Sequence, residues 1–135
     1  MSSASHSVSA LEHNKQLVIR WFEEVWNQGR RETIVELFPP NAVLHDGANH
    51  FHGPEEFFRF YDDLRAQFSD FRITPLVALA EADLACVHWS AAFRHTATSK
   101  SLQISGTSIV RIENGQFQEA WQNWDAAGLS AQLAT

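Results

Sequence analysis

The last predicted strand, residues 116–124, carries the acid whose surroundings point most directly to chemistry. Alternation along a strand places Glu119 on one face with Phe117 and Trp121. A carboxylate between two aromatic side chains is costly unless it has a partner, and desolvation raises its pKa toward the range of useful acids and bases. Asp125, at the end of the strand, has the same parity. Both acids are therefore acid/base candidates, unless this face is turned to solvent and Glu119 is simply hydrated.

A histidine closes an otherwise apolar face of the strand predicted at residues 84–96. His95 shares its parity with Trp89 and Phe93. A histidine in such a place is either a structural residue with satisfied hydrogen bonds or a functional one. If the face meets Glu119 across a cavity, His95 becomes a proton donor or a hydrogen-bonding group for a substrate.

The loop at residues 45–52 holds the side chains that most resemble metal ligands. Imidazole groups suit zinc, iron or nickel, and His50 and His52 could bind together in an extended segment. A closed site would need His45 or Asp46 in register, which the spacing does not enforce. We predict no metal site and interpret this loop as a polar rim over a pocket.

The remaining sequence motifs argue against covalent and cofactor chemistry. Cys86, the single cysteine, lies between Ala85 and Val87 in a predicted strand, which is typical of a small buried residue rather than a nucleophile. The chain has no nucleophile-elbow, P-loop or dinucleotide-binding glycine motif. We therefore expect no cofactor.

Composition sets the broad class of the protein. The 135 residues suffice for one hydrophobic core and no more. Sixteen acidic against ten basic residues give a net charge of −6, the wrong sign for a sequence-independent nucleic-acid binder. No apolar run approaches the ~20 residues of a membrane span, and the opening residues do not resemble a secretory signal. We expect one cytoplasmic domain at residues 11–135, preceded by a disordered tail at residues 1–10.

Hydrophobic periodicity divides the domain into helices followed by strands. Apolar side chains at three- and four-residue spacing predict helices at residues 11–27, 31–38 and 54–68, and a last helical turn or two at 126–133. A short extended piece is expected at 42–45, and longer strands at 71–80, 84–96, 102–112 and 116–124. The short joins between the long strands imply an antiparallel meander, and the order of elements implies an α+β domain with helices on one face.

Five short segments follow one another in an order that matches a known family. They are WNQG at 26–29, VLHD at 43–46, GPEEF at 53–57, FRHT at 93–96 and EAWQNWDAAGL at 119–129. On these segments the chain, from roughly residue 12 to residue 133, resembles the SnoaL-like polyketide cyclases of the nuclear transport factor 2-like superfamily.

The resemblance implies a cone-shaped domain in which three N-terminal helices pack on a curved, mainly antiparallel sheet of four to six strands and enclose one pocket. It also implies a homodimer joined through the outer sheet face, and chemistry without metal or cofactor. In the cyclases an acidic side chain abstracts the proton α to a carbonyl, and polar neighbours stabilise the enolate. Relatives isomerise ketosteroids, dehydrate, open epoxides or only bind ligands, so the fold limits function weakly.

The chain departs from the family pattern in two places. The turn at residues 96–101 is tight where family members often carry a longer loop, which predicts a more open or differently shaped pocket mouth. The cyclases use an aspartate on the late strands, assisted by histidine and glutamine on the neighbouring strand. Here that neighbour carries Ser105 and Thr107, while the late strand carries Glu119 and Asn123.

Residues and resemblance together predict a cofactor-independent enzyme of cyclase or isomerase type. It would act on a hydrophobic, oxygenated small molecule by acid/base chemistry next to a carbonyl. Glu119 or Asp125 would be the acid/base. His95 and His45 would assist it, and Asn123 would bind the substrate by a hydrogen bond. The expected aromatic walls are Trp21, Phe57, Tyr61, Trp89, Phe93 and Trp121. The alternative is a non-catalytic ligand-binding or dimeric scaffold domain of the same fold.

Overall fold

The structure, a computed structural model, describes residues 7–135, so the first six residues of the predicted tail lie outside the described residues. Four α-helices and a π-helix occur in this part of the chain. They are α1 (Val8–Trp21), η1 (Phe22–Asn27), α2 (Arg31–Leu37), α3 (Gly53–Gln67) and α4 (Ala126–Ala134). None of the described helices is long and apolar enough to cross a membrane.

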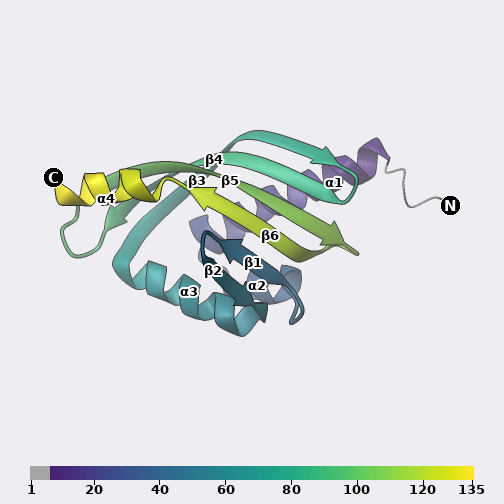
Figure 1. Cartoon of the computed structure of the whole chain (residues 1–135), viewed down its shortest axis with the longest axis horizontal. Helices are drawn as coiled ribbons and strands as arrows, with labels where there is room; N and C mark the ends of the chain where they lie inside the picture. The colour runs from purple at the N-terminus through teal and green to yellow at the C-terminus, as the bar shows by residue number, and fades with distance from the viewer. Residues whose placement is uncertain (1–6) are drawn as a thin grey trace.

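Six strands form a single mixed sheet in the order β2-β1-β6-β5-β4-β3. Their bounds are β1 (Val43–Asp46), β2 (Asn49–His52), β3 (Phe68–Glu81), β4 (Leu84–His95), β5 (Ser101–Glu113) and β6 (Gln116–Trp124). All neighbouring strands are antiparallel except β1 and β6, which run parallel. In Figure 1 α1 lies behind the long strands, and α3 lies beside the β1–β2 hairpin. The predicted α+β class with a mainly antiparallel sheet is confirmed.

The segment predicted as a loop at residues 45–52 is largely a β-hairpin at the end of the sheet. Strand β1 pairs with β2 on one side and with β6 on the other, so His45 lies opposite both His50 and Trp121. Gly47 forms the turn with a φ of +62°, a backbone conformation that glycine adopts at no steric cost. This parallel addition to β6 could not be read from local periodicity, because its partner is more than 70 residues away.

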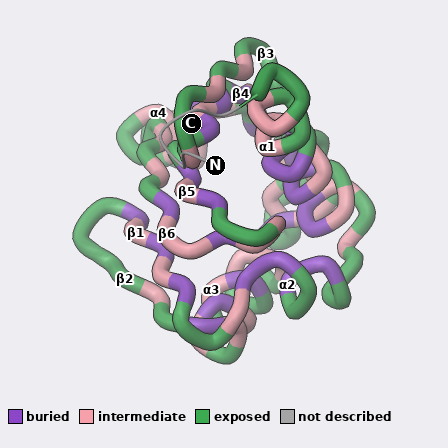
Figure 2. The backbone as a smooth tube through the Cα atoms, turned by 90° about the vertical axis from the view of Figure 1, so that its right-hand side faces the viewer, coloured by how far each residue is buried: buried purple, intermediate pink, exposed green. Residues whose placement is uncertain are grey.

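The first helical segment changes its winding where it meets the pocket. In η1 the backbone N–H of Gln28 donates to the oxygen of Glu23, five residues earlier, at 2.9 Å. Such π-helical turns are rare and are frequently found at functional sites. The segment brings Phe22 and Trp26 into the core, facing the sheet. Figure 2 shows the buried parts of the helices and of the sheet facing one another around the interior.

A bulge in β6 reverses the side-chain alternation on which the sequence prediction relied. Glu119 pairs with Arg111, but Phe117 pairs with the next residue, Ile112, so Gln118 is an extra residue in β6. Phe117 is therefore buried in the core while Glu119 lies on the outer face of the sheet. The predicted common face of Phe117 and Glu119 is wrong, because one inserted residue exchanges the two faces of a strand.

Candidate functional site

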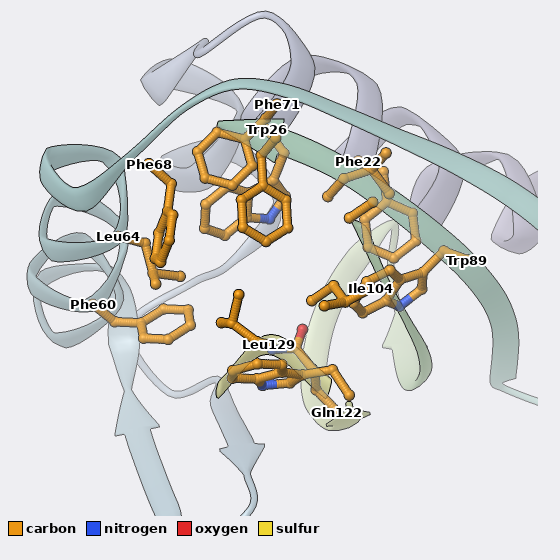
Figure 3. Close-up of a pocket in the computed structure, with 14 residues that line it drawn as sticks. Phe22, Trp26, Phe60, Leu64, Phe68, Phe71, Trp89, Ile104, Gln122 and Leu129 are labelled. Atoms are coloured by element: carbon orange, nitrogen blue, oxygen red, sulfur yellow. The ribbon is translucent and has the colours of Figure 1, made fainter. Parts of the chain in front are cut away.

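One aromatic pocket lies between the inner face of the sheet, η1, α3 and α4. It is a cavity of about 80 Å³, and Figure 3 shows its lining side chains converging from these elements. Thirteen of the fourteen lining residues are aromatic or aliphatic; Gln122 is the exception. The full set is Phe22, Trp26, Phe60, Leu64, Phe68, Phe71, Ile73, Trp89, Ala91, Phe93, Ile104, Gln122, Trp124 and Leu129.

The polar side-chain atoms of the pocket wall are few, and two of them are already bonded. The indole N–H of Trp89 donates to the hydroxyl of Ser108 at 3.1 Å, and that of Trp124 donates to a carboxylate oxygen of Asp46 at 2.9 Å. The Gln122 amide makes no hydrogen bond to another side chain or main-chain group in residues 7–135. It is therefore free to bind a ligand oxygen or hydroxyl, since an amide group both donates and accepts.

Asp46 is a buried acid that is hydrogen-bonded to a residue of the pocket wall. In the sequence prediction it is only part of the loop at residues 45–52. The residue is 8% exposed, and its Oδ1 accepts the bond from Trp124. Within the described residues Oδ2 accepts no hydrogen bond. The signal that could have identified it was the parity of residues 43–46, because Asp46 lies on the same face as the buried Leu44.

Glu119 belongs instead to a polar cluster on the outer face of the sheet. Its Oε2 lies 2.6 Å from Nε2 of His45, and its Oε1 lies 3.6 Å from Nη2 of Arg111. Nδ1 of His45 lies 2.7 Å from Nδ1 of His50, and the His45 ring stacks on Trp121 at 5.7 Å between ring centroids. The hydrogen bond from His45 lowers the pKa of Glu119, so the upward shift predicted for this acid is wrong.

The other predicted polar residues lie around the rim or on the surface. Asp125 caps the start of α4, where its Oδ1 accepts a bond from the backbone N–H of Gly128 at 2.9 Å. Asn123 is exposed. His95 is half-buried; its Nδ1 lies 2.9 Å from the hydroxyl of Thr98, and its ring lies 5.7 Å from that of Phe68, a pocket residue. Within the described residues no group of three or more histidine, cysteine or acidic side chains is arranged to hold a metal ion.

The six aromatic residues predicted as pocket walls divide among three places. Trp89 and Phe93 line the pocket. Trp21 and Phe57 line a smaller neighbouring cavity of about 30 Å³. Tyr61 is buried, and its hydroxyl donates to the carbonyl oxygen of Val25 at 2.7 Å; Trp121 is on the outer face. Most of the wall is not among the predicted residues, including Phe22, Trp26 and Phe60, because helical periodicity does not show which apolar side chains face a cavity.

Comparison with known proteins places the chain in a family. Residues 18–130 match the family model described as the SnoaL-like domain, which is most of the chain. The protein belongs to the SnoaL-like family. No curated protein matches it.

Solved structures share the SnoaL-like fold of this chain at low sequence identity. The candidate polyketide cyclase IdmH of Streptomyces antibioticus is 24% identical, with a TM-score of 0.77 over 90% of this chain and 99% of that one. A SnoaL-like candidate polyketide cyclase of Jannaschia sp. CCS1 is 18% identical, with a TM-score of 0.82 over 94% and 99%. An epoxide hydrolase of M. tuberculosis is 10% identical, with a TM-score of 0.75 over 92% and 91%. The SnoaL-like chain thus has cyclase-type and hydrolase-type structural neighbours.

Proposed function

We propose that this protein is a cofactor-independent enzyme of cyclase or isomerase type, acting next to a carbonyl of a hydrophobic, oxygenated small molecule. The observation that carries the proposal is the hydrogen bond between Trp124 and Asp46. It joins a buried carboxylate to the wall of an aromatic pocket. An apolar cavity with a few convergent polar groups and a nearby acid is the usual form of such a site.

Gln122 is the group that would bind the substrate oxygen. Its side chain faces the pocket from β6 and has no partner among the described residues. In an apolar cavity its N–H group would stabilise the negative charge that develops on a carbonyl oxygen when an enolate forms. The oxygen of the same amide can accept a hydrogen bond from a hydroxyl group, so Gln122 can bind either a ketone or an enol.

Asp46 is the group that we propose takes the proton. Its Oδ2 would accept the proton from the carbon next to the carbonyl, and the electrons of the broken C–H bond would move to the carbonyl oxygen. Because Asp46 lies behind Trp124 and does not itself line the cavity, the substrate must displace this indole to reach it. The earlier prediction of Glu119 or Asp125 as the acid/base, assisted by His95 and His45, stays a prediction.

Deuterium incorporation tests the proposal without knowledge of the natural substrate. In D₂O, an apolar ketone such as 1-tetralone would exchange the protons next to its carbonyl for deuterium faster in the presence of the protein than in buffer alone. ¹H NMR follows this exchange. We expect Asp46→Asn to remove this acceleration, since the amide keeps an oxygen for Trp124 but is no base. Loss of the acceleration in Glu119→Gln or Asp125→Asn, with Asp46→Asn active, would assign the proton transfer to the predicted acids instead.

A second candidate function is ligand binding without catalysis. It is favoured by the absence of any ionisable side chain among the residues that line the pocket in residues 7–135. This candidate predicts that the neutral fluorescent ketone prodan binds in the pocket while no ketone exchanges its protons faster than in buffer. Acceleration that Asp46→Asn removes would contradict it.

We further propose that two copies of the chain associate through the outer sheet face. Leu79, Cys86, Ile109 and Trp121 are directly paired across four strands and form one row on that face. Leu79 is 63% exposed and Ile109 is 39% exposed, although such side chains usually gain from burial. Light scattering of the full chain should give twice the mass of one copy, and Ile109→Lys should reduce it to one. The expected cytoplasmic location stays a prediction.

A further inference from the structure

Helix α4 covers one side of the pocket but buries little surface of its own. None of its residues is fully buried, and it packs on β5. Leu129 is its one side chain among those lining the pocket, and Figure 3 shows it pointing into the cavity near Gln122. Because buried apolar area is the main source of stability, α4 is held more weakly than η1 or α3.

The side chain of Gln132 bonds α4 to the edge of the sheet. Strand β6 ends at Trp124, opposite Gly106, so the earlier residues of β5 have no strand partner on that side. The amide of Gln132 takes that place: the backbone N–H of Gln103 donates to its Oε1 at 2.9 Å, and its Nε2 donates to the Gln103 oxygen at 2.7 Å. One side chain thereby reproduces the paired bonds of a neighbouring strand.

The two ends of α4 are also held by polar contacts. Asp125 caps its first turn. At its last turn Nζ of Lys100, which comes from the short turn after β4, lies 3.1 Å from the main-chain oxygen of Gln132 and 2.5 Å from that of Thr135. A cation there also compensates the negative end of the helix dipole. Besides the partly buried Leu129 and Leu133, α4 is thus attached by polar bonds, most of them exposed, which open at lower cost than a packed apolar core.

We propose that α4 opens and closes the pocket, as a gate, and that the side chain of Gln132 holds it in the closed position, as a latch. When the two bonds between Gln132 and Gln103 break and Lys100 releases the last turn, α4 turns away about its capped start at Asp125 and withdraws Leu129 from the cavity. Closing restores both bonds and places Leu129 against the ligand. The proposal rests on the proposed function only in requiring that the pocket takes up a ligand; the opening of α4 is a property of the free chain.

Two measurements on the full chain test the latch, with Gln132→Ala as the variant and Gln116→Ala as its matched control. Gln116 donates one side-chain bond to the main-chain oxygen of Glu36, far from α4. Hydrogen exchange measured by mass spectrometry should become roughly tenfold faster in residues 126–134 of Gln132→Ala, a change of about 1.4 kcal/mol in the opening equilibrium. The remaining helices and the control should exchange at the wild-type rate.

Stopped-flow fluorescence of prodan adds the kinetic test. In Gln132→Ala we expect association and dissociation both to be roughly tenfold faster, with the Kd within about threefold of wild type, because a gate changes access rather than affinity. Leu129→Ala should instead weaken the Kd, since this residue contacts the ligand when α4 is closed.

Unchanged exchange in residues 126–134 of Gln132→Ala would overturn the latch, as would faster exchange throughout the chain, which would indicate general destabilisation. Wild-type prodan rates in a variant whose α4 exchanges faster would overturn the gate. Failure of the wild-type protein to bind prodan would contradict the proposed function. Hydrogen exchange is measured without a ligand, so it would still test whether Gln132 holds α4 closed.

Discussion

The indole N–H of Trp124 donates to Oδ1 of Asp46 at 2.9 Å, and this bond ties the buried acid of β1 to the wall of the pocket. The two residues are 78 positions apart and meet because β1 adds to β6 in parallel. A buried carboxylate needs such a partner, since an unpaired one would be costly. The same pairing leaves Oδ2 without a hydrogen-bond donor among the described residues.

Replacing Trp124 by phenylalanine should destabilise the fold by leaving the buried Asp46 without its donor. We expect a loss of about 1–3 kcal/mol in the free energy of unfolding, measured by urea denaturation. Combining the change with Asp46→Leu should recover part of this loss, because the unpaired carboxylate is then gone. Trp121→Phe, on the outer face, is the matched control. An equal loss in Trp121→Phe, or no recovery in the double variant, would contradict this account of the pair.

Replacing Gln122 by leucine should separate hydrogen bonding from apolar contact in the pocket. We expect prodan to bind about 2- to 12-fold more weakly, the effect of losing one hydrogen bond worth about 0.5–1.5 kcal/mol. An aromatic hydrocarbon such as pyrene, which cannot form that bond, should bind at least as well as to the wild type. Fluorescence titration measures both. Equal weakening for the two probes would show that Gln122 contributes shape only.

The outer cluster should make stability depend on acid pH. The His45 bond lowers the pKa of Glu119 below its ordinary value of 4.5. An acid with a lowered folded-state pKa stabilises the fold above its unfolded-state pKa, and this contribution is lost as pH falls through the folded value. The free energy of unfolding should therefore fall less steeply below pH 4.5 in Glu119→Gln than in wild type, as measured by urea denaturation across pH. Identical slopes would contradict the pairing with His45.

Gly106 should tolerate no larger residue, because the sheet and an indole ring close around it. A Cβ at this position would lie 2.4 Å from Cζ2 of Trp89 and 2.7 Å from the backbone oxygen of Asn123. Gly106→Ala should destabilise the fold by about 1–3 kcal/mol and weaken prodan binding, since Trp89 must shift in the pocket wall. Ser105→Ala, the exposed neighbour, serves as control. Wild-type stability in Gly106→Ala would contradict the close packing.

Local sequence patterns were sufficient to predict the direction of side chains in strands whose alternation runs without interruption. In β4 the alternation is regular from Leu84 to His95, so the inward direction of Trp89 and Phe93 could be predicted from parity alone. In β6 the extra residue Gln118 exchanges the two faces, and no local feature of the sequence signals it. Unbroken alternation would place Glu119 on the face of Phe117 and would turn Gln122 away from it, whereas Gln122 faces the pocket.

Long-range pairing explains the rest of the difference. Asp46 becomes important only when β1 lies beside β6 and Trp124 reaches it, which periodicity in a four-residue strand cannot show. The role of Gln132 depends likewise on where β6 ends relative to Gln103. The fold class, in contrast, rests on helix and strand periods and turn residues, which are local properties.

The most direct test of the proposed chemistry compares two acids on opposite faces of the same sheet. Deuterium incorporation into 1-tetralone should be accelerated by the wild-type protein and by Glu119→Gln, and should fall to the buffer rate with Asp46→Asn, while all three bind prodan. Wild-type acceleration by Asp46→Asn would contradict the assignment of proton transfer to the acid beside Trp124.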